Sequence, residues 1–506
     1  MTEKNQDTGI SRPGLLLALT PVVLTLMVLG VQIFYFGDFT PHIPLAIGLA
    51  LTSLVGIKLG FKWKDIEEGI FHVIHIALPS VSVLICVGMI IGVWIASGTV
   101  PTLIYYGLTI LSPQIFLVAA MLLCSVVSVS LGTSWGTVGT VGLALMGIGA
   151  GFDVPVYWTA GAVVSGAFFG DKISPLSDTT NLAPAVTGTN VFSHIKNMMP
   201  TTLPAMIAAV IIYLAAGFML VHDGEVSFAK INSITTELQK HFVISPWLLL
   251  PALLVIVLAV KRIAPIPSLF AGVVAGAITA MIAQGNGIHE VVTFANSGYT
   301  INTDVTAINT LLNRGGIQSM MWTISLVLIA LGFGGALERT GCLETIILAI
   351  LTKIHKFKDI QTAAVCTSIS TNLVAGDPYL SIALPGRMYS PVYRGMKYST
   401  LNLSRALEEG GTLVSPLIPW NAGGAFVISA LGLGISDGNF ENLLYIPLAF
   451  ACWLSPVLGI FYAQLGFFSP KASAEELAQW KEQGEDSLTP EEARENAEET
   501  LASQQT

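Results

Sequence analysis

The sequence predicts an all-α integral membrane protein built from two structural repeats. Three observations support this prediction. Hydrophobic residues make up 53% of the 506-residue chain, and only 11% of its residues are charged, against about 25% in a soluble domain. Long apolar runs recur along the chain. Three short motifs of the first half also return in the same order in the second half, 241–244 residues later.

The apolar runs set the number of membrane segments. The first run, residues 14–36, has 23 residues without a charge, enough to cross a bilayer core of about 30 Å. It is too long for a signal-peptide core and no small-residue cleavage site follows, so we expect an uncleaved first helix. Further runs of spanning length lie at residues 42–61, 73–96, 113–131, 154–170, 198–221, 245–262, 266–283, 318–337, 358–375 and 443–466. With the shorter pieces described next, the chain is expected to have about 11–13 membrane segments.

Shorter apolar pieces lie between the long runs. They cover residues 100–111, 139–151, 342–352, 379–386 and 424–435. Short pieces interrupted by Gly or Pro are typical of broken helices or re-entrant hairpins in membrane proteins. Basic residues flank the first two runs on one side, which predicts a cytoplasmic N-terminus over residues 1–12.

The last segment, residues 471–506, differs from the rest. It holds ten acidic and three basic residues and accounts for −7 of the formal net charge of −9. We therefore expect a transporter-like domain over residues 13–470 and an acidic tail that is cytoplasmic or solvated, either helical or disordered. The negative charge is local, so nothing in it indicates a nucleic-acid partner.

The internal repeat is carried by matched motifs. Residues 98–104 resemble residues 341–346, and Ser-Pro-Leu at 174–176 returns at 415–417. Ser128 to Gly132 likewise resembles the segment that ends at Gly376. The repeats are expected at about residues 70–221 and 318–466. Two repeats that meet around a midplane site are typical of secondary transporters.

Polar residues gather at corresponding places in the two halves. In the first half they lie at residues 132–137 and 170–181, and in the second half at residues 372–378 and 408–421. Ionisable residues inside a membrane protein mark ion or substrate pathways. Sodium is a hard cation that takes oxygen ligands. Where a helix is broken at Gly or Pro, backbone carbonyl oxygens become available to bind it. The predicted sodium ligands are Asp171, Asp178, Asp377, Asn181, Asn421, Ser174 and Thr137. The predicted proton pathway comprises Asp171, Asp178, Glu408 and Glu409.

The chemistry of these residues predicts ion exchange. Burial favours the protonated form of a carboxylic acid, whereas a bound cation favours the carboxylate. If a proton and sodium compete for one aspartate, loading one ion expels the other, which produces antiport when the site faces the two sides in turn.

Other roles remain open for the same residues. Asp178 could be only a helix N-cap, Asp377 a turn residue, and Glu408 with Glu409 a solvated helix end. The glycines at 132–142 could serve close helix packing. Arg387 and Arg394 could bind a carboxylate or form a cytoplasmic basic loop.

An enzyme receives little support. The five cysteines lie in apolar segments without a CxxC pair, and no HExxH or Walker A pattern occurs. We expect no cofactor, with sodium as a substrate. A membrane-embedded enzyme that uses Asp171 and Asp178 as an acid–base pair remains a distant alternative.

Residues 170–184 resemble the signature of the NhaC-type sodium/proton antiporters, and residues 132–137 resemble the glycine-rich segment that precedes it there. The resemblance extends from about Pro13 to Phe468 and leaves out the tail. It implies two inverted repeats, each with a re-entrant hairpin. It also implies a multi-pass protein of the bacterial inner membrane that exports sodium in exchange for protons.

Similar proteins exchange malate for lactate with sodium and protons, and others carry amino acids. A sodium-coupled organic-anion antiporter is therefore the first alternative. The expected partners are sodium, protons and membrane lipid, and a homodimer is left open.

Overall fold

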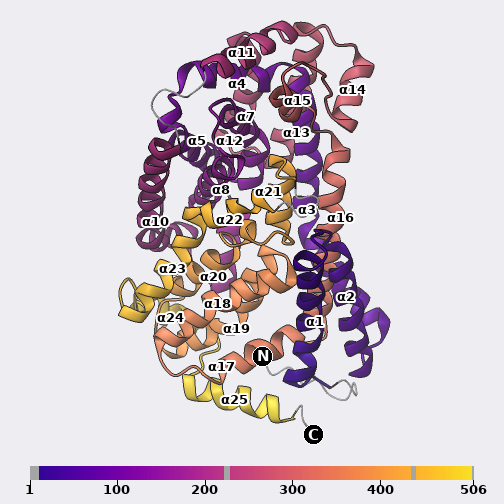
Figure 1. Ribbon diagram of the computed structural model, residues 1–506. Coiled ribbons are helices and arrows are strands. Elements are labelled where there is room, and N and C mark those ends of the chain that lie inside the picture. Colours follow the sequence, from indigo (N-terminus) through magenta and orange to yellow (C-terminus); the bar gives the residue numbers. More distant parts are fainter. Residues whose placement is uncertain (1–10, 221–227, 435–439, 504–506) are drawn as a thin grey trace.

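The computed structural model describes residues 11–220, 228–434 and 440–503. Helices and connecting segments make up these residues, with no strand among them. Most of the predicted N-terminal segment 1–12 lies outside the described residues. The chain begins with an antiparallel pair, α1 (Leu15–Phe34) and α2 (His42–Lys58), beside the two long helices α3 (Trp63–Ala96) and α16 (Ile317–Arg339) (Figure 1).

Six helices in the described part of the chain are long and apolar enough to cross a membrane, or up to nine if each bent pair counts as one span. Besides α1, α3 and α16 these are the segment Pro113–Leu131, α10 (Val191–Leu220) and α13 (Pro265–Ala283). The bent pairs turn by 88° at residues 241–246, 40° at 417–422 and 43° at 448–450. The all-α membrane fold is therefore confirmed. This count by length and hydropathy is below the expected 11–13 because several of the expected segments are short helices or helices that carry charged residues.

The helices of the two halves correspond element by element. Helix α3 ends before Gly98, and α16 ends before Gly341. Both glycines have a left-handed backbone, with φ of 78° and 75°, and each starts a short helix, α4 (Thr99–Ile110) or α17 (Cys342–Leu351).

The next helices, α5 (Phe116–Leu131) and α18 (Phe357–Ala375), end at Gly132 and Gly376, which are again left-handed, with φ of 65° and 67°. Glycine has no Cβ, so it adopts this left-handed backbone at the end of a helix without a steric penalty. Repeated glycines at matched breaks thus produce matched folds.

The two repeats run in opposite directions. The Gly316 N–H, at the start of α16, donates to the carbonyl O of Gly88 in the C-terminal half of α3 (2.7 Å). At the other end, Arg339 Nε donates to the carbonyl O of Asp65 (3.0 Å). Equivalent helices α3 and α16 are therefore antiparallel, and Figure 1 shows α4 and α17 at opposite ends of the molecule. This geometry is that of an inverted repeat.

Each repeat then places a broken helix against the other. In the first repeat the pieces are α8 (Val156–Ile173) and α9 (Asp178–Thr187), and in the second they are α20 (Leu401–Gly411) and α21 (Ala422–Leu431). Helix α9 packs on α20 and on α19 (Pro378–Gly395), and α21 packs on α16 and on the first-repeat segment 134–142. There the rings of Trp135 and Phe426 stack with centroids 4.9 Å apart.

Segment 134–142 is itself irregular. It is made of α6 (Ser134–Thr137) and η2 (Val138–Gly142), a π-helical stretch that continues into α7 (Leu143–Gly151). Single π-helical turns of this kind often lie at functional sites. The other helices are α11 (Phe228–His241), α12 (Leu250–Val260), α14 (Ile288–Ser297), α15 (Thr306–Leu312), α22 (Tyr445–Leu448) and α23 (Phe450–Leu465).

The acidic tail forms two helices, α24 (Ala474–Glu482) and α25 (Pro490–Ser503). Most of its charged side chains are exposed, while Ala493 and Ala497 are buried against the second repeat. Arg394, near the end of α19, pairs with Glu485 of the tail (2.7 Å). The tail is thus attached to the helix whose other end lies at the site described below.

The contact between the antiparallel helices predicts the effect of a small substitution. A Cβ at position 88 would lie 2.7 Å from the carbonyl O of Gly316. Because neither backbone can move freely, Gly88→Ala is expected to lower stability by about 1–3 kcal/mol. Thermal unfolding in detergent measures this. Gly30→Ala is the control, because nothing lies within 4 Å of a Cβ there. Equal melting temperatures for the two variants would contradict the prediction.

Candidate cation site

The site forms where the chain breaks between α8 and α9. Residues 174–177 leave the helix because Pro175 removes a backbone donor. The Ser174 hydroxyl donates to the carbonyl O of Val129 (2.7 Å), and the Ser177 hydroxyl caps α9 by accepting from the Thr180 N–H. Asp171 and Asp178 therefore lie on either side of an ordered break.

A cavity of about 370 Å³ lies at this break. From the first repeat its polar lining residues are Ser80, Thr133, Ser134, Asp171, Asp178 and Thr179. From the second repeat they are Tyr379, Thr412 and Ser415. No lysine, arginine or histidine is among the described residues that line it. Two carboxylates and several hydroxyl groups thus face a space at the seam of the repeats without a positive counter-charge.

Asp171 is the buried carboxylate of the pair, with 5% of its surface exposed. Its Oδ2 accepts a hydrogen bond from Ser134 Oγ at 2.7 Å. Its Oδ1 is buried and has no hydrogen-bond partner among the described residues. An unpaired buried oxygen of this kind is costly and is suited to a proton or a cation.

Asp178 is the accessible carboxylate and is the first residue of α9. Its Oδ1 accepts from the N–H of Thr179 (2.9 Å), and its Oδ2 accepts from the Tyr379 hydroxyl. The Tyr379 oxygen also lies 3.2 Å from Ser80 Oγ. The N-cap of the helix is Ser177, so Asp178, which lines the cavity, is not the capping residue.

Asp377 lies behind Tyr379. It is buried and caps α19, where its Oδ1 accepts from the Leu380 N–H at 2.9 Å. It does not line the cavity, but the tyrosine two residues later joins its helix to Asp178.

The predicted amide and hydroxyl ligands lie outside the cavity. Asn421 is buried, and its Nδ2 donates to the carbonyl O and to Oδ1 of Asn372 (3.0 and 2.8 Å). Its Oδ1 accepts from Ser415 Oγ (2.5 Å). Asn181 Nδ2 donates to the carbonyls of Pro175 and Ser177. Thr137 donates to a carbonyl within its own turn. Together with Ser174, these side chains hold the broken backbone in place.

Glu408 and Glu409 of α20 are both fully buried, not at a solvated helix end. The Thr179 hydroxyl donates to Glu408 Oε1 (3.3 Å), which places this acid directly behind the cavity. Glu409 lies farther back, 3.7 Å from Lys172 Nζ.

The donor set suits an alkali cation better than a transition metal. Among the described residues, no group of three or more His, Cys, Asp or Glu side chains could hold a metal ion together. A cation in the cavity would rely on Asp171 and Asp178 with hydroxyl and backbone oxygens, which are ligands for hard cations.

Comparison with known proteins identifies the family. The model of the Na+/H+ antiporter family matches residues 14–180 and 166–467. This chain belongs to the Na+/H+ antiporter family. It is 40% identical over 452 residues to the Na(+)/H(+) antiporter NhaC of Alkalihalophilus pseudofirmus, an alignment that covers 88% of this chain and 96% of that relative. The resemblance noted in the sequence is confirmed.

Other relatives have different names. The chain is 37% identical to the malate-2H(+)/Na(+)-lactate antiporter of Bacillus subtilis, over 88% of this chain and 94% of the relative. It is 34% identical to the arginine/ornithine antiporter ArcD of Halobacterium salinarum, over 92% of this chain and 96% of the relative. Family membership therefore leaves the substrate to be argued from the cavity.

Several polar side chains of the cavity lining were not among the predicted ligands. They are Ser80, Thr133, Ser134, Thr179, Tyr379, Thr412 and Ser415. Most of them lie within the polar segments 132–137, 170–181 and 408–421 that the sequence singled out, and Tyr379 directly follows the segment 372–378, so these segments were a signal for the lining. Ser80 lies inside a long apolar helix and carries no such signal.

The placement of Asn421 predicts a structural effect. Asn421→Ala removes the cap of α21 and leaves buried partners unsatisfied, at a cost of about 2–4 kcal/mol. The readout is the melting temperature in detergent without sodium. Asn442→Ala is the control, since the hydrogen bond from its side-chain amide to the carbonyl O of Gly434 is exposed. An unchanged melting temperature for Asn421→Ala would contradict its role as a brace.

Proposed function

We propose that this protein is a secondary antiporter that exchanges sodium for protons through competition at Asp171 and Asp178. The observation that carries the proposal is the cavity at the seam of the repeats, whose described lining residues include two carboxylates and no basic side chain. Membership of the Na+/H+ antiporter family supports the same exchange.

The two carboxylates differ in a way that suits exchange. Asp178 is accessible from the cavity, and Asp171 is buried with one unpaired oxygen. A cation that enters first meets Asp178, and it replaces a proton when it reaches Asp171. Glu408, behind Thr179, is the next acid that can take up that proton. Asp377 acts on the site through Tyr379.

Inverted repeats supply the alternation. Each repeat contributes one side of the seam. The present packing of α9 on α19 and α20 can therefore be replaced by the equivalent packing in which the two repeats have exchanged their conformations. The same carboxylates then face the two sides of the membrane in turn. In the bacterial inner membrane, the inward proton gradient would drive sodium out and contribute to pH homeostasis.

An organic-anion antiporter is the second candidate, supported by the malate-2H(+)/Na(+)-lactate relative. The cavity argues against it, because an organic carboxylate would face two acidic side chains and no basic side chain among the described lining residues. Of the arginines considered for such a role, Arg387 pairs with Glu338 (2.7 Å) and Arg394 with Glu485, and neither lines the cavity. The named relatives are transporters, which supports transport rather than catalysis by an enzyme.

Removal of the charge on Asp178 tests the exchange. In everted membrane vesicles, Asp178→Asn is expected to lower sodium-driven proton movement by about tenfold or more, equivalent to at least ~1.4 kcal/mol of lost interaction. Asp304→Asn, in an exposed loop, is the control and should retain the wild-type rate. Unchanged exchange in Asp178→Asn would remove this residue from the mechanism.

The choice between the two candidates needs purified protein in liposomes with defined ions. Sodium addition alone is expected to move protons, because none of the described residues that line the cavity is a lysine, arginine or histidine that could pair with an organic anion. Malate and lactate, added on opposite sides, should leave the rate unchanged. Proton movement that depends absolutely on either anion would favour the organic-anion antiporter.

A further inference from the structure

The acidic tail and the residues just before it are bound to the turn between α19 and α20. The Lys397 carbonyl O accepts from the Ala472 N–H (3.0 Å), and the Ser399 N–H donates to the carbonyl O of Pro470 (3.1 Å). The Ser399 hydroxyl donates to Glu476 Oε1 (2.6 Å). The turn is therefore held through backbone groups as well as side chains.

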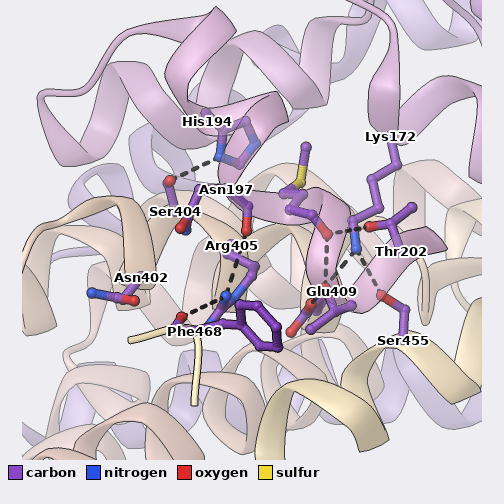
Figure 2. Close-up of polar contacts among 12 residues, drawn as sticks. Lys172, His194, Asn197, Thr202, Asn402, Ser404, Arg405, Glu409, Ser455 and Phe468 are labelled. Atoms are coloured by element: carbon purple, nitrogen blue, oxygen red, sulfur yellow. Dashed lines mark hydrogen bonds and ion pairs between the residues drawn. The ribbon is translucent and has the colours of Figure 1, made fainter. Parts of the chain in front are cut away.

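The helices on either side of this turn are held as well. On α20, Arg405 is fully buried and donates to the carbonyl O of Phe468 (3.0 Å), as Figure 2 shows. On α19, the buried Arg394 pairs with Glu485 (2.7 Å) and donates to the carbonyl O of Asp486 (3.3 Å). Each helix is thus joined to the C-terminal segment by a buried arginine.

The fit is close where the tail crosses the end of α19. The Leu488 N–H donates to the carbonyl O of Pro391 (2.9 Å). The Leu488 carbonyl O lies so near Gly395 that a Cβ there would collide with it. Helix α25 then packs on α17. Residues 468–503, the clamp, therefore join α17 to α19 and α20.

The clamp holds helices that belong to the candidate site. Helix α19 carries Tyr379 at its other end, and the Tyr379 hydroxyl donates to Asp178. Helix α9 packs on both α19 and α20, and this packing is replaced during the alternation proposed above. Helix α17 packs on α1 and α16. A movement of α19 and α20 relative to α17 therefore requires contacts of the clamp to break.

The backbone at the clamp is strained at two positions. Lys397 and Phe468 have left-handed backbones, with φ of 58° and 47°, which residues other than glycine seldom adopt. The carbonyl O of each accepts a hydrogen bond across the contact between the turn and the clamp. Strained backbone of this kind persists where surrounding contacts hold it, and it is common in switch regions. Release of the clamp would let both residues relax.

We propose that the C-terminal segment is an autoinhibitory clamp: while it is docked on the turn between α19 and α20 it slows alternation, and its release speeds alternation. The inference rests on the proposed function, because the rate that the clamp limits is that of sodium/proton exchange. The clamp lies beyond residue 467, where the match to the family model ends. It contributes no residue to the cavity lining, so its release should change the maximal rate and leave the half-saturating sodium concentration unchanged.

The experiment makes two measurements on the purified full-length protein. Hydrogen exchange of residues 470–490 reports whether the clamp is docked, and sodium-driven proton movement in liposomes reports the rate. Gly395→Ala collides with the clamp, and Glu485→Arg places a second positive charge beside Arg394. Both variants are expected to lower the protection of this segment. They should also raise the maximal exchange rate by about two- to fivefold, the factor that a partly exposed ion pair can contribute.

Three matched variants serve as controls. Gly30→Ala adds a Cβ where nothing lies within 4 Å, and Glu499→Arg makes the same charge change at an exposed position of the tail. Both should equal the wild type in protection and rate. Arg394→Glu combined with Glu485→Arg rebuilds the ion pair in reverse, so it should restore both the protection and the wild-type rate.

The outcomes separate this inference from the exchange itself. A wild type that exchanges sodium for protons, with released variants that do so no faster or more slowly, would overturn the clamp and leave the proposed function intact. Protection that stays at the wild-type level in both released variants would contradict the docking. Absence of sodium-driven proton movement in the wild type and in every variant would overturn the proposed function and the clamp together.

Discussion

The constraint on which this structure depends is that broken backbone inside a membrane protein must find hydrogen-bond partners within the protein. At the break between α8 and α9, Ser174 and Asn181 supply them. At the matched break in the second repeat, Asn372 donates to the carbonyls of Gly410 and Gly411, and Asn421 donates in turn to Asn372. Because these carbonyls already have hydrogen-bond partners, the breaks stay open, and acidic side chains can lie at the seam between the repeats.

This constraint separates two kinds of polar residue that look alike in sequence. The asparagines of the motifs are bound to backbone groups and give the breaks their shape. Asp171, in contrast, keeps an unpaired oxygen, and Asp178 lines the cavity although each of its oxygens accepts one hydrogen bond. The residues that can bind an ion are those whose oxygens keep acceptor capacity that the fold has not used.

The arrangement of charge also relates the site to its family. The cavity lining in this chain contains acids and hydroxyls, whereas the basic residues Lys172 and Arg405 are buried behind it. A scaffold of this kind can serve relatives with different substrates, because a change in the cavity lining alters which ligand the cavity binds while the helix breaks stay the same.

The sequence by itself determined the helical membrane fold, the two repeats and the polar clusters that approach one another, because hydropathy and short repeated motifs such as Ser-Pro-Leu are local properties. It also singled out Asp171 and Asp178. Only the tertiary structure decided that Asn421, Asn181, Ser174 and Thr137 are bound to backbone groups and that Tyr379, which lies beside Ser80, reaches Asp178. It also decided that Glu408 and Glu409 are buried. These outcomes depend on contacts between residues that lie far apart in the chain, across two antiparallel repeats, and no local pattern specifies which oxygen remains unpaired when the repeats meet.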